Sequence, residues 1–371
     1  MKNVKNFIAD KNSSILLFLI LNTIVFFLRI FSYSYITYAA IFLEIIAIIA
    51  YLNHLLKSEK SKKTLVIEAA IIAIVGIVYM MSGFKYEYLL ITYLTVFGSK
   101  DIEYTQAIKY IFITQLICMS TVLILTIPGI IPDAVSTKHT VSGHYFTIHS
   151  LGFGHGNTFY CLYFNLMAMF LYLYKEKIKL TTVLLLSAGS FVFYLLTFSR
   201  TGFVCTLLLI LSIYALKKAP NFIDKLFNSK IVKITLVLLE PLLFIFVYLC
   251  STSLFGSELA NITNSLITNR INVSNHYIKT FGVHILPQSF TMGVEFDNLY
   301  AFSLVSFGWL YNIFISILYI MLMTKLLKKK MNHEIVIICA FLLYGFSERI
   351  VISIFRNISI IFYAELLRDK K

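Results

Sequence analysis

The chain has 371 residues, of which 59% are hydrophobic and 13% are charged, and its mean hydropathy is +0.83. A soluble globule of this size cannot bury so many apolar side chains, so a water-soluble protein is excluded. The formal net charge of +14 does not require nucleic acid as a partner, because basic loops facing anionic lipid headgroups account for it. We expect an all-α polytopic membrane protein surrounded by a lipid bilayer.

Twelve apolar runs approach the length that crosses a hydrocarbon core of about 30 Å. We expect one integral membrane domain over residues 1–371, with twelve transmembrane helices and two long outer loops, at 128–156 and 252–298. The runs lie near residues 14–31, 35–56, 64–82, 86–98, 104–127, 157–174, 180–198, 202–216, 231–251, 301–324, 334–347 and 351–367.

The basic residues predict the orientation of these spans. If the N-terminus is cytosolic, 24 of the 32 lysines and arginines fall on the cytosolic side of the membrane. Cytosolic loops carry the excess of basic residues in membrane proteins. We therefore expect a multi-pass protein of the bacterial cytoplasmic membrane with both termini in the cytoplasm.

The arginines run against this trend. Five of the six fall at outer span ends or in outer loops: Arg29, Arg200, Arg270, Arg349 and Arg356. Snorkelling toward headgroups accounts for Arg29 and Arg356. For Arg200 and Arg270 we favour a binding role, because a guanidinium holds phosphate or carboxylate through two parallel hydrogen bonds and lysine does not. Arg349 is a further candidate for substrate binding.

The first outer loop contains His139, His144, His149 and His155. Their spacing does not place them on one helical face, so a metal site is not expected and the first three are interpreted as loop residues. His155 differs because it lies in GFGHGN, where the sixth span begins. Asn157 is expected to cap the following helix, whose free N–H groups would then face an anion. A capped turn without a ligand is the alternative.

The second outer loop is predicted to contain an amphipathic helix. At 100° per residue, one apolar stripe collects Leu259, Ile262, Leu266, Val273 and Tyr277. Arg270 falls on the same stripe. A guanidinium directed away from water should have an anionic partner.

A carboxylate stands at the end of the second outer loop, where Asp297-Asn298 precede the tenth span. Asp297 is either the cap of that helix or a general base beside phosphates bound by arginine. If it is only a cap, His155, His284 or Glu348 becomes the expected proton acceptor.

Several motifs, in this order, resemble the Wzy-type repeat-unit polymerases of capsule and O-antigen synthesis, a superfamily that includes the O-antigen ligases. They are HSLGFGHGNTF before a span, LTFSRTGF between two short spans, NRI and then FG in the long loop, DNLYAFSLVSFGWL entering a span, and YGFSER. The resemblance covers most of the chain from about residue 85. It departs from the family where Gly156 replaces a proline and where Asp297-Asn298 replace the His-Asn pair of the ligases.

The resemblance implies a membrane glycosyltransferase with a GT-C-like fold and with neither metal nor cofactor. Such an enzyme transfers a growing glycan from undecaprenyl diphosphate to a lipid-linked repeat unit on the outer face of the membrane. It implies that Arg200 and Arg270 bind the diphosphate, that Asp297 and Asn298 occupy the position of the catalytic pair, and that His155 and Asn157 line the pocket. The expected partners are the undecaprenyl-diphosphate-linked oligosaccharide, a flippase and a chain-length regulator.

Two other classes stay open. A flippase for lipid-linked oligosaccharides would also be polytopic and cationic, with charges inside several spans; Glu44, Glu68 and Glu240 are the candidates. A scaffold without activity would not need an arginine on the inner stripe of its loop. Within the enzyme class, a ligase that joins the glycan to another acceptor is the nearest alternative.

Overall fold

The structure is a computed structural model. It describes residues 11–30, 34–58, 61–83, 86–139, 145–252, 257–266, 269–289 and 297–368. Parts of both predicted outer loops, including His144, lie outside the described residues.

Each of the first eleven predicted spans corresponds to an α-helix, and three further helices, α10, α12 and α13, lie between spans. In chain order the helices are α2 (Lys11–Leu28), α3 (Ser34–Lys57), α4 (Lys62–Met81), α5 (Glu87–Ser99), α6 (Tyr104–Thr126), α7 (Gly156–Leu173), α8 (Leu180–Thr197), α9 (Arg200–Lys218), α10 (Pro220–Asn228), α11 (Lys230–Ser251), α12 (Ser257–Leu266), α13 (Arg270–Phe281), α14 (Leu299–Lys329) and α15 (Asn332–Gly345). The short 3-10 helices are η1 (Lys175–Lys177), η2 (Arg349–Ile352) and η3 (Ile358–Leu366).

Seven helices among the described residues are long and apolar enough to cross a membrane. They are α3 from Ile36, α4 from Thr64, α6, α8, α9, α11 and α14, while α2 and α15 are shorter apolar helices. Many large apolar side chains on these helices are exposed, for example Phe42, Leu185 and Ile231. The chain is therefore a multi-pass membrane protein, because such faces are stable only against lipid.

The twelfth predicted span is not α-helical. Residues 351–367 form parts of η2 and η3, separated by a turn. The Asn357 side chain accepts a hydrogen bond from the Ser359 N–H at 3.1 Å, and such local side-chain bonds compete with the α-helical pattern. The segment is nevertheless buried, with Ile358, Ile361 and Phe362 inside the protein.

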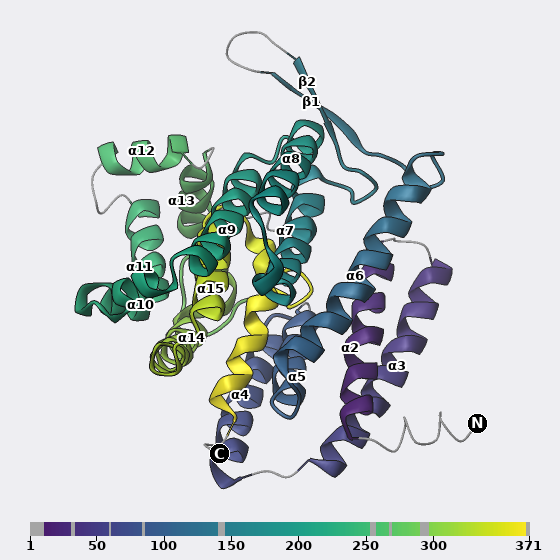
Figure 1. Ribbon diagram of the computed structural model, residues 1–371, viewed down its shortest axis with the longest axis vertical. Helices are drawn as coiled ribbons and strands as arrows, with labels where there is room; N and C mark the ends of the chain where they lie inside the picture. Colours follow the sequence, from purple (N-terminus) through teal and green to yellow (C-terminus); the bar gives the residue numbers. More distant parts are fainter. Residues whose placement is uncertain are drawn as a thin grey trace. The chain divides into compact units, whose positions relative to one another are not determined.

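The chain divides into two compact units, residues 1–60 with 95–214 and residues 61–94 with 215–371. In the first unit α2 packs on α3 and α6, α6 on α7, and α7 on α8 (Figure 1). A buried amide pair joins α6 to α7. The Gln115 side chain donates to the Leu162 carbonyl at 3.0 Å and accepts from Asn165 at 3.1 Å, so both amides are satisfied away from water.

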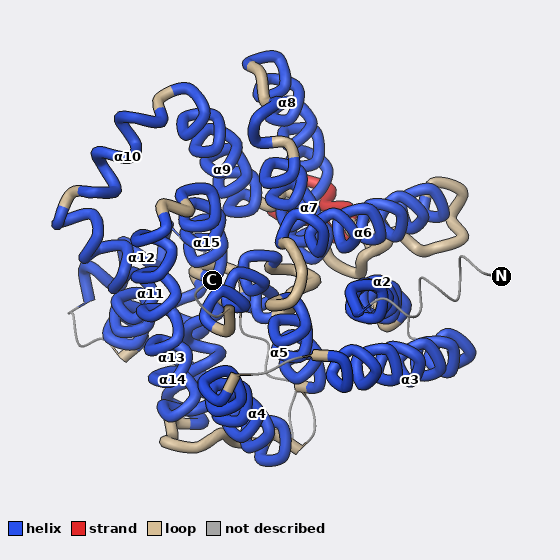
Figure 2. The backbone as a smooth tube through the Cα atoms, turned by 60° about the horizontal axis from the view of Figure 1, so that its bottom comes forward, coloured by secondary structure: helices blue, strands red, loops and turns tan. Residues whose placement is uncertain are grey.

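The first unit also contains a β-hairpin that the all-α prediction did not include. Strands β1 (Val135–His139) and β2 (Tyr145–His149) pair antiparallel, with Val135 opposite His149, and they are the two strands of the described chain (Figure 2). The segment YFTIH alternates aromatic and β-branched residues with polar ones, a pattern typical of strands. The first outer loop is thus an ordered hairpin at its base.

In the second unit α14 is the central helix, in contact with α4, α11, α13, α15, η2 and η3. The Tyr319 hydroxyl donates to the Leu236 carbonyl of α11, and the Tyr300 hydroxyl donates to the Leu342 carbonyl of α15, each at 2.7 Å. These bonds fix α14 against both neighbours within the membrane-spanning part of the unit.

A kink divides α14 at Gly308, whose φ of 75° and ψ of 174° are not helical. At the kink, two backbone N–H groups of α14 donate hydrogen bonds to carbonyl groups of the loop that follows α13 instead of to carbonyls of their own helix. Trp309 N–H donates to the His284 carbonyl at 2.9 Å, and Leu310 N–H donates to the Ile285 carbonyl at 3.0 Å. A Cβ at Gly308 would lie 2.7 Å from the Ile285 oxygen, so only glycine fits here.

Candidate functional site

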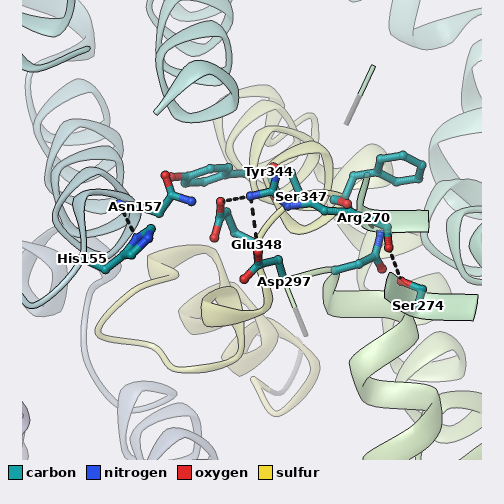
Figure 3. A network of polar contacts seen from close by, with 10 residues as sticks. His155, Asn157, Arg270, Ser274, Asp297, Tyr344, Ser347 and Glu348 are labelled. Carbon is teal, nitrogen blue, oxygen red and sulfur yellow. Dashed lines mark hydrogen bonds and ion pairs between the residues drawn. The ribbon is translucent and has the colours of Figure 1, made fainter. Parts of the chain in front are cut away.

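The second unit brings together three charged residues that are far apart in the sequence: Arg270, Asp297 and Glu348. We name them the Arg270 cluster. The guanidinium of Arg270 lies between the two carboxylates (Figure 3), with Nη2 at 2.7 Å from Glu348 Oε1 and at 3.7 Å from Asp297 Oδ2. All three are candidate residues from the sequence, and the prediction that Arg270 has an anionic partner is confirmed.

Arg270 is the first residue of α13, and a bend between α12 and α13 sets its position. Asn269 adopts the left-handed conformation at φ 68°, which asparagine tolerates better than most residues. Its side-chain oxygen accepts hydrogen bonds from the Asn264 and Asn272 side chains at 2.9 Å and 2.8 Å. The Ser274 hydroxyl donates to the Arg270 carbonyl at 2.7 Å. These hydrogen bonds hold Asn269 in its left-handed conformation, and the side chain of Arg270 that follows it is largely buried.

The single amphipathic stripe predicted across this loop is wrong in detail. Leu259, Ile262 and Val273 are exposed, whereas α13 buries Ile271, Ser274 and Ile278. The bend at Asn269 interrupts the helical period, so one stripe cannot continue from α12 into α13. Arg270 does face inward as predicted, and its side chain is 12% exposed.

Glu348 follows α15 in an extended conformation, with φ −140° and ψ 120°. Its backbone N–H donates to the Tyr344 carbonyl at 3.1 Å, and its side chain is 5% exposed. Burial raises the pKa of the Glu348 carboxyl to about 8; the Arg270 guanidinium opposes this shift and the negative charge of Asp297 adds to it. Glu348 is thus a buried carboxyl whose pKa lies well above its ordinary value.

Asp297 is the exposed member of the cluster, since 59% of its side chain is accessible. The predicted capping role belongs to its neighbour. Asn298 is the N-cap of α14, and its side-chain oxygen accepts from Ala301 N–H at 3.0 Å. The Asn298 amide also donates to the Phe346 carbonyl at 2.7 Å. Asn298 therefore ties the start of α14 to the turn that carries Glu348, and Asp297 is left to face solvent.

Arg349 lies next to Glu348 in the chain and begins η2. Its guanidinium carbon is 5.4 Å from the ring centroid of Phe302 in α14, a cation–π contact. Its positive charge lowers the pKa of the Glu348 carboxyl, although less than Arg270 does. Arg349 thus adds a second guanidinium to the field at the Arg270 cluster.

His284 occupies the loop that supports the kink of α14. Its ring Nε2 lies 3.0 Å from the Phe281 carbonyl oxygen, and its own carbonyl accepts from Trp309. These bonds assign His284 a structural position, which makes it a weaker candidate for proton acceptor than the carboxylates.

The remaining candidate residues belong to the first unit. His155, not Asn157, is the N-cap of α7: its Nδ1 accepts from Asn157 N–H at 3.1 Å (Figure 3). A Cβ at Gly156 would lie 2.8 Å from the Thr197 carbonyl oxygen. Gly156 thus lies at a point where α7 and the end of α8 approach closely, and glycine has no Cβ to obstruct that approach.

Arg200 is the first residue of α9 and is exposed. Its guanidinium carbon lies 5.2 Å from the ring centroid of Phe198, which has a positive φ of 53° and ends α8. The left-handed Phe198 turns the chain sharply between α8 and α9, and its ring supports the Arg200 side chain.

Asp133 has a structural role at the base of the hairpin that the sequence did not predict. Its carboxylate accepts from His149 Nδ1 at 2.6 Å, from the Ser150 hydroxyl at 3.0 Å and from Leu151 N–H at 2.8 Å. Partial burial alone would raise the pKa of Asp133, but these hydrogen bonds outweigh it and the pKa is lowered. His149 is therefore held at the base of the hairpin and is not a free loop residue. The Pro-Asp pair before a strand was the available signal.

The second unit also encloses a cavity of about 120 Å³ in the membrane-spanning region. Its walls are mainly apolar and aromatic, and Glu240 is a buried polar group within it, accepting from the Ser316 hydroxyl at 2.7 Å. Within the described ranges, no three His, Cys, Asp or Glu side chains gather in a way that could hold a metal ion.

Comparisons with protein-family models, with curated proteins and with solved structures find no match for this chain.

Proposed function

We propose that this chain is a polysaccharide repeat-unit polymerase, a membrane glycosyltransferase that transfers a growing glycan from undecaprenyl diphosphate to a lipid-linked repeat unit. The observation that carries the proposal is the Arg270 cluster, in which a largely buried arginine from the long loop lies between one buried and one exposed carboxylate. Its members come from the loop, from the start of α14 and from the turn after α15.

Each residue type suits one requirement of the reaction. Cleaving the bond between the sugar carbon and the diphosphate leaves negative charge on the departing phosphate oxygen. A guanidinium in a region of low dielectric constant stabilises that developing charge. A guanidinium has five N–H donors in a planar fork, so Arg270 can hold Glu348 and donate to a phosphate at once.

The attacking sugar hydroxyl must lose a proton. Asp297 is the carboxylate of the cluster that solvent can reach, and we assign it the role of general base. Glu348 is buried against Arg270, and we assign it the role of positioning the guanidinium. Arg349 adds positive charge for the diphosphate. Arg200, His155 and Asn157 belong to the first unit, and their proposed role in binding substrate rests on the sequence motifs alone.

The orientation is part of the proposal. The Arg270 cluster joins segments at the ends of α13, α14 and α15 that precede or follow predicted spans on the outer side. The lysine-rich ends of the helices are proposed to face the cytosol, with the protein in the bacterial cytoplasmic membrane. A flippase and a chain-length regulator are the proposed protein partners.

Deletion of the gene tests the proposal. Loss of the polymerase should leave single repeat units linked to their carrier on the outer face while long polymer disappears. Accumulation of those units on the cytosolic side would instead identify a flippase. Normal long polymer that is no longer joined to its final acceptor would identify a ligase.

A further inference from the structure

A second feature of the second unit lies at the opposite, lysine-rich ends of α11 and α14. A groove of about 470 Å³ runs between them and is lined by Lys233, Ile234, Val237, Leu238, Thr324, Leu327 and Lys328. Both helices are apolar enough to span a membrane. The floor of the groove is therefore apolar at membrane depth, and an ammonium group stands on each wall.

The charges around this groove are unbalanced. The Glu365 carboxylate already forms ion pairs with three basic side chains. Its oxygens lie 3.6 Å from Lys325 Nζ, 2.6 Å from Lys329 Nζ and 3.6 Å from Arg368 Nη1. The Asp224 carboxylate accepts from the Asn332 side chain at 2.6 Å. In the part of the chain that the structure describes, neither Lys233 nor Lys328 forms an ion pair with a carboxylate. The groove thus offers two positive charges to a ligand from outside the chain.

The preceding helix indicates what surrounds the groove. α10 is a nine-residue helix (Pro220–Asn228) in contact with α11, and Phe222 and Leu226 are exposed on it. A short helix with exposed apolar side chains between two spans lies at a membrane interface. The groove therefore opens at the level where the phosphates of one leaflet meet its acyl chains.

We infer that this groove binds an anionic phospholipid, with its phosphate between Lys233 and Lys328 and an acyl chain along Ile234, Val237 and Leu238. The stretch from Lys233 to Leu238 extends about 7 Å along α11, which accommodates the upper part of an acyl chain. Basic pockets between transmembrane helices bind lipid phosphates in this manner. The inference does not depend on the proposed glycosyltransferase activity.

Native mass spectrometry of the purified full chain, titrated with phosphatidylglycerol or with phosphatidylcholine, tests the site. We expect preferential binding of phosphatidylglycerol on the order of tenfold, since each lysine near a lipid phosphate contributes to the affinity. The double variant Lys233→Gln/Lys328→Gln should lose the preference. The matched control Lys109→Gln/Lys177→Gln removes two exposed lysines of the first unit and should keep it.

A second variant tests the apolar floor of the groove independently of its two lysines. Val237→Trp fills the floor and leaves both lysines in place, so it should also lose the preference if an acyl chain lies there. The inference is overturned if the parental chain does not distinguish the two lipids, if either the double lysine variant or Val237→Trp retains the preference, or if the control loses it equally. A lipid-free dimer with this face at its interface, detected by crosslinking through Leu238→Cys, would also overturn it.

Discussion

Arg270 and Glu348 are 78 residues apart in the sequence, yet Nη2 of the arginine lies 2.7 Å from Oε1 of the glutamate. Both side chains are largely buried. Removing one partner of a buried ion pair leaves the other charge uncompensated, which commonly costs about 3–5 kcal/mol. For Arg270, a variant that keeps the positive charge therefore separates the role of the side chain's shape from the cost of losing the ion pair.

The first prediction concerns the shape of the cation. Arg270→Lys keeps the charge but loses the planar fork, so we expect polymer formation to fall by at least about tenfold with normal protein abundance. Arg200→Lys should behave in the same way. Polymer is measured by gel analysis of surface glycan.

Arg29→Lys is the matched control for these variants. Arg29 also pairs with a glutamate, Glu44, at 2.6 Å, but it lies outside both proposed binding regions. We expect it to retain polymer formation. Near-normal polymer in both Arg200→Lys and Arg270→Lys would refute the diphosphate clamp.

The second prediction concerns the general base. Asp297→Asn cannot accept a proton, so we expect a fall in rate of roughly 10²–10⁴-fold, the range for general acid–base catalysis, with folding and binding of lipid-linked repeat units unchanged. A reconstituted assay with purified lipid-linked repeats measures it. Since Asn298 caps α14, a fall in rate cannot be attributed to a lost cap. An Asn variant that polymerises at the parental rate would pass the role of proton acceptor to Glu348.

The third prediction concerns pH. Because the pKa of Glu348 is about 8, the carboxyl ionises as the pH rises through that value and then competes with a bound phosphate for Arg270. We expect the affinity for undecaprenyl diphosphate to decline above pH 8 in the parental chain. Glu348→Gln should show a flatter profile over the same range. The same slope in both chains would contradict the assignment.

The same shift has a consequence for stability. A carboxyl whose pKa is raised in the folded state contributes stability below its ordinary pKa of about 4.3 and loses that contribution as the pH rises through the folded value. The thermal stability of the parental chain in detergent should therefore fall relative to Glu348→Gln as the pH increases from about 5 to about 9.

The fold was predictable where apolar runs are long, because burial in lipid and backbone hydrogen bonding leave the helix as the stable choice. The prediction of a transmembrane α-helix over residues 351–367 was wrong. Asn357 and Ser359 form a local hydrogen bond there, and the segment forms 3-10 helices. The pairing of Arg270 with Glu348 could not be located from the sequence, because no local pattern encodes a contact across 78 residues. The resemblance pointed to Arg270 through the NRI motif, whereas Glu348, which lies in the YGFSER motif, was expected only as an alternative proton acceptor.

The fourth prediction concerns the kink in α14. Gly308→Ala places a Cβ 2.7 Å from the Ile285 oxygen at a positive φ, so we expect a loss of roughly 1–3 kcal/mol in unfolding free energy. Gly76→Ala in α4 is the control, since a Cβ there meets nothing within 4 Å, and it should be neutral or slightly stabilising. Thermal unfolding of the two variants in detergent measures the difference. Equal midpoints would show that the loop carbonyls do not constrain position 308.

The fifth prediction concerns topology. In a background without native cysteines, Val135→Cys in β1 and Lys279→Cys in α13 should react with a membrane-impermeant reagent in intact cells. Lys177→Cys and Lys225→Cys should react only after permeabilisation. All four side chains are exposed, so a lack of reaction reports the side of the membrane and not burial. The reverse pattern would invert the proposed orientation. Ser274 is unsuitable for this test because it is buried.

The kink of α14 also provides an optical probe. Trp309 is the chain's single tryptophan. Its backbone N–H bonds to the loop at His284, and its ring lies 5.2 Å from that of Tyr248 in α11. Selective excitation of indole fluorescence therefore reports on one region of the protein, where the loop after α13 contacts the kink of α14. Any ligand that shifts α13 against α14 becomes measurable in the unlabelled protein as a change in emission.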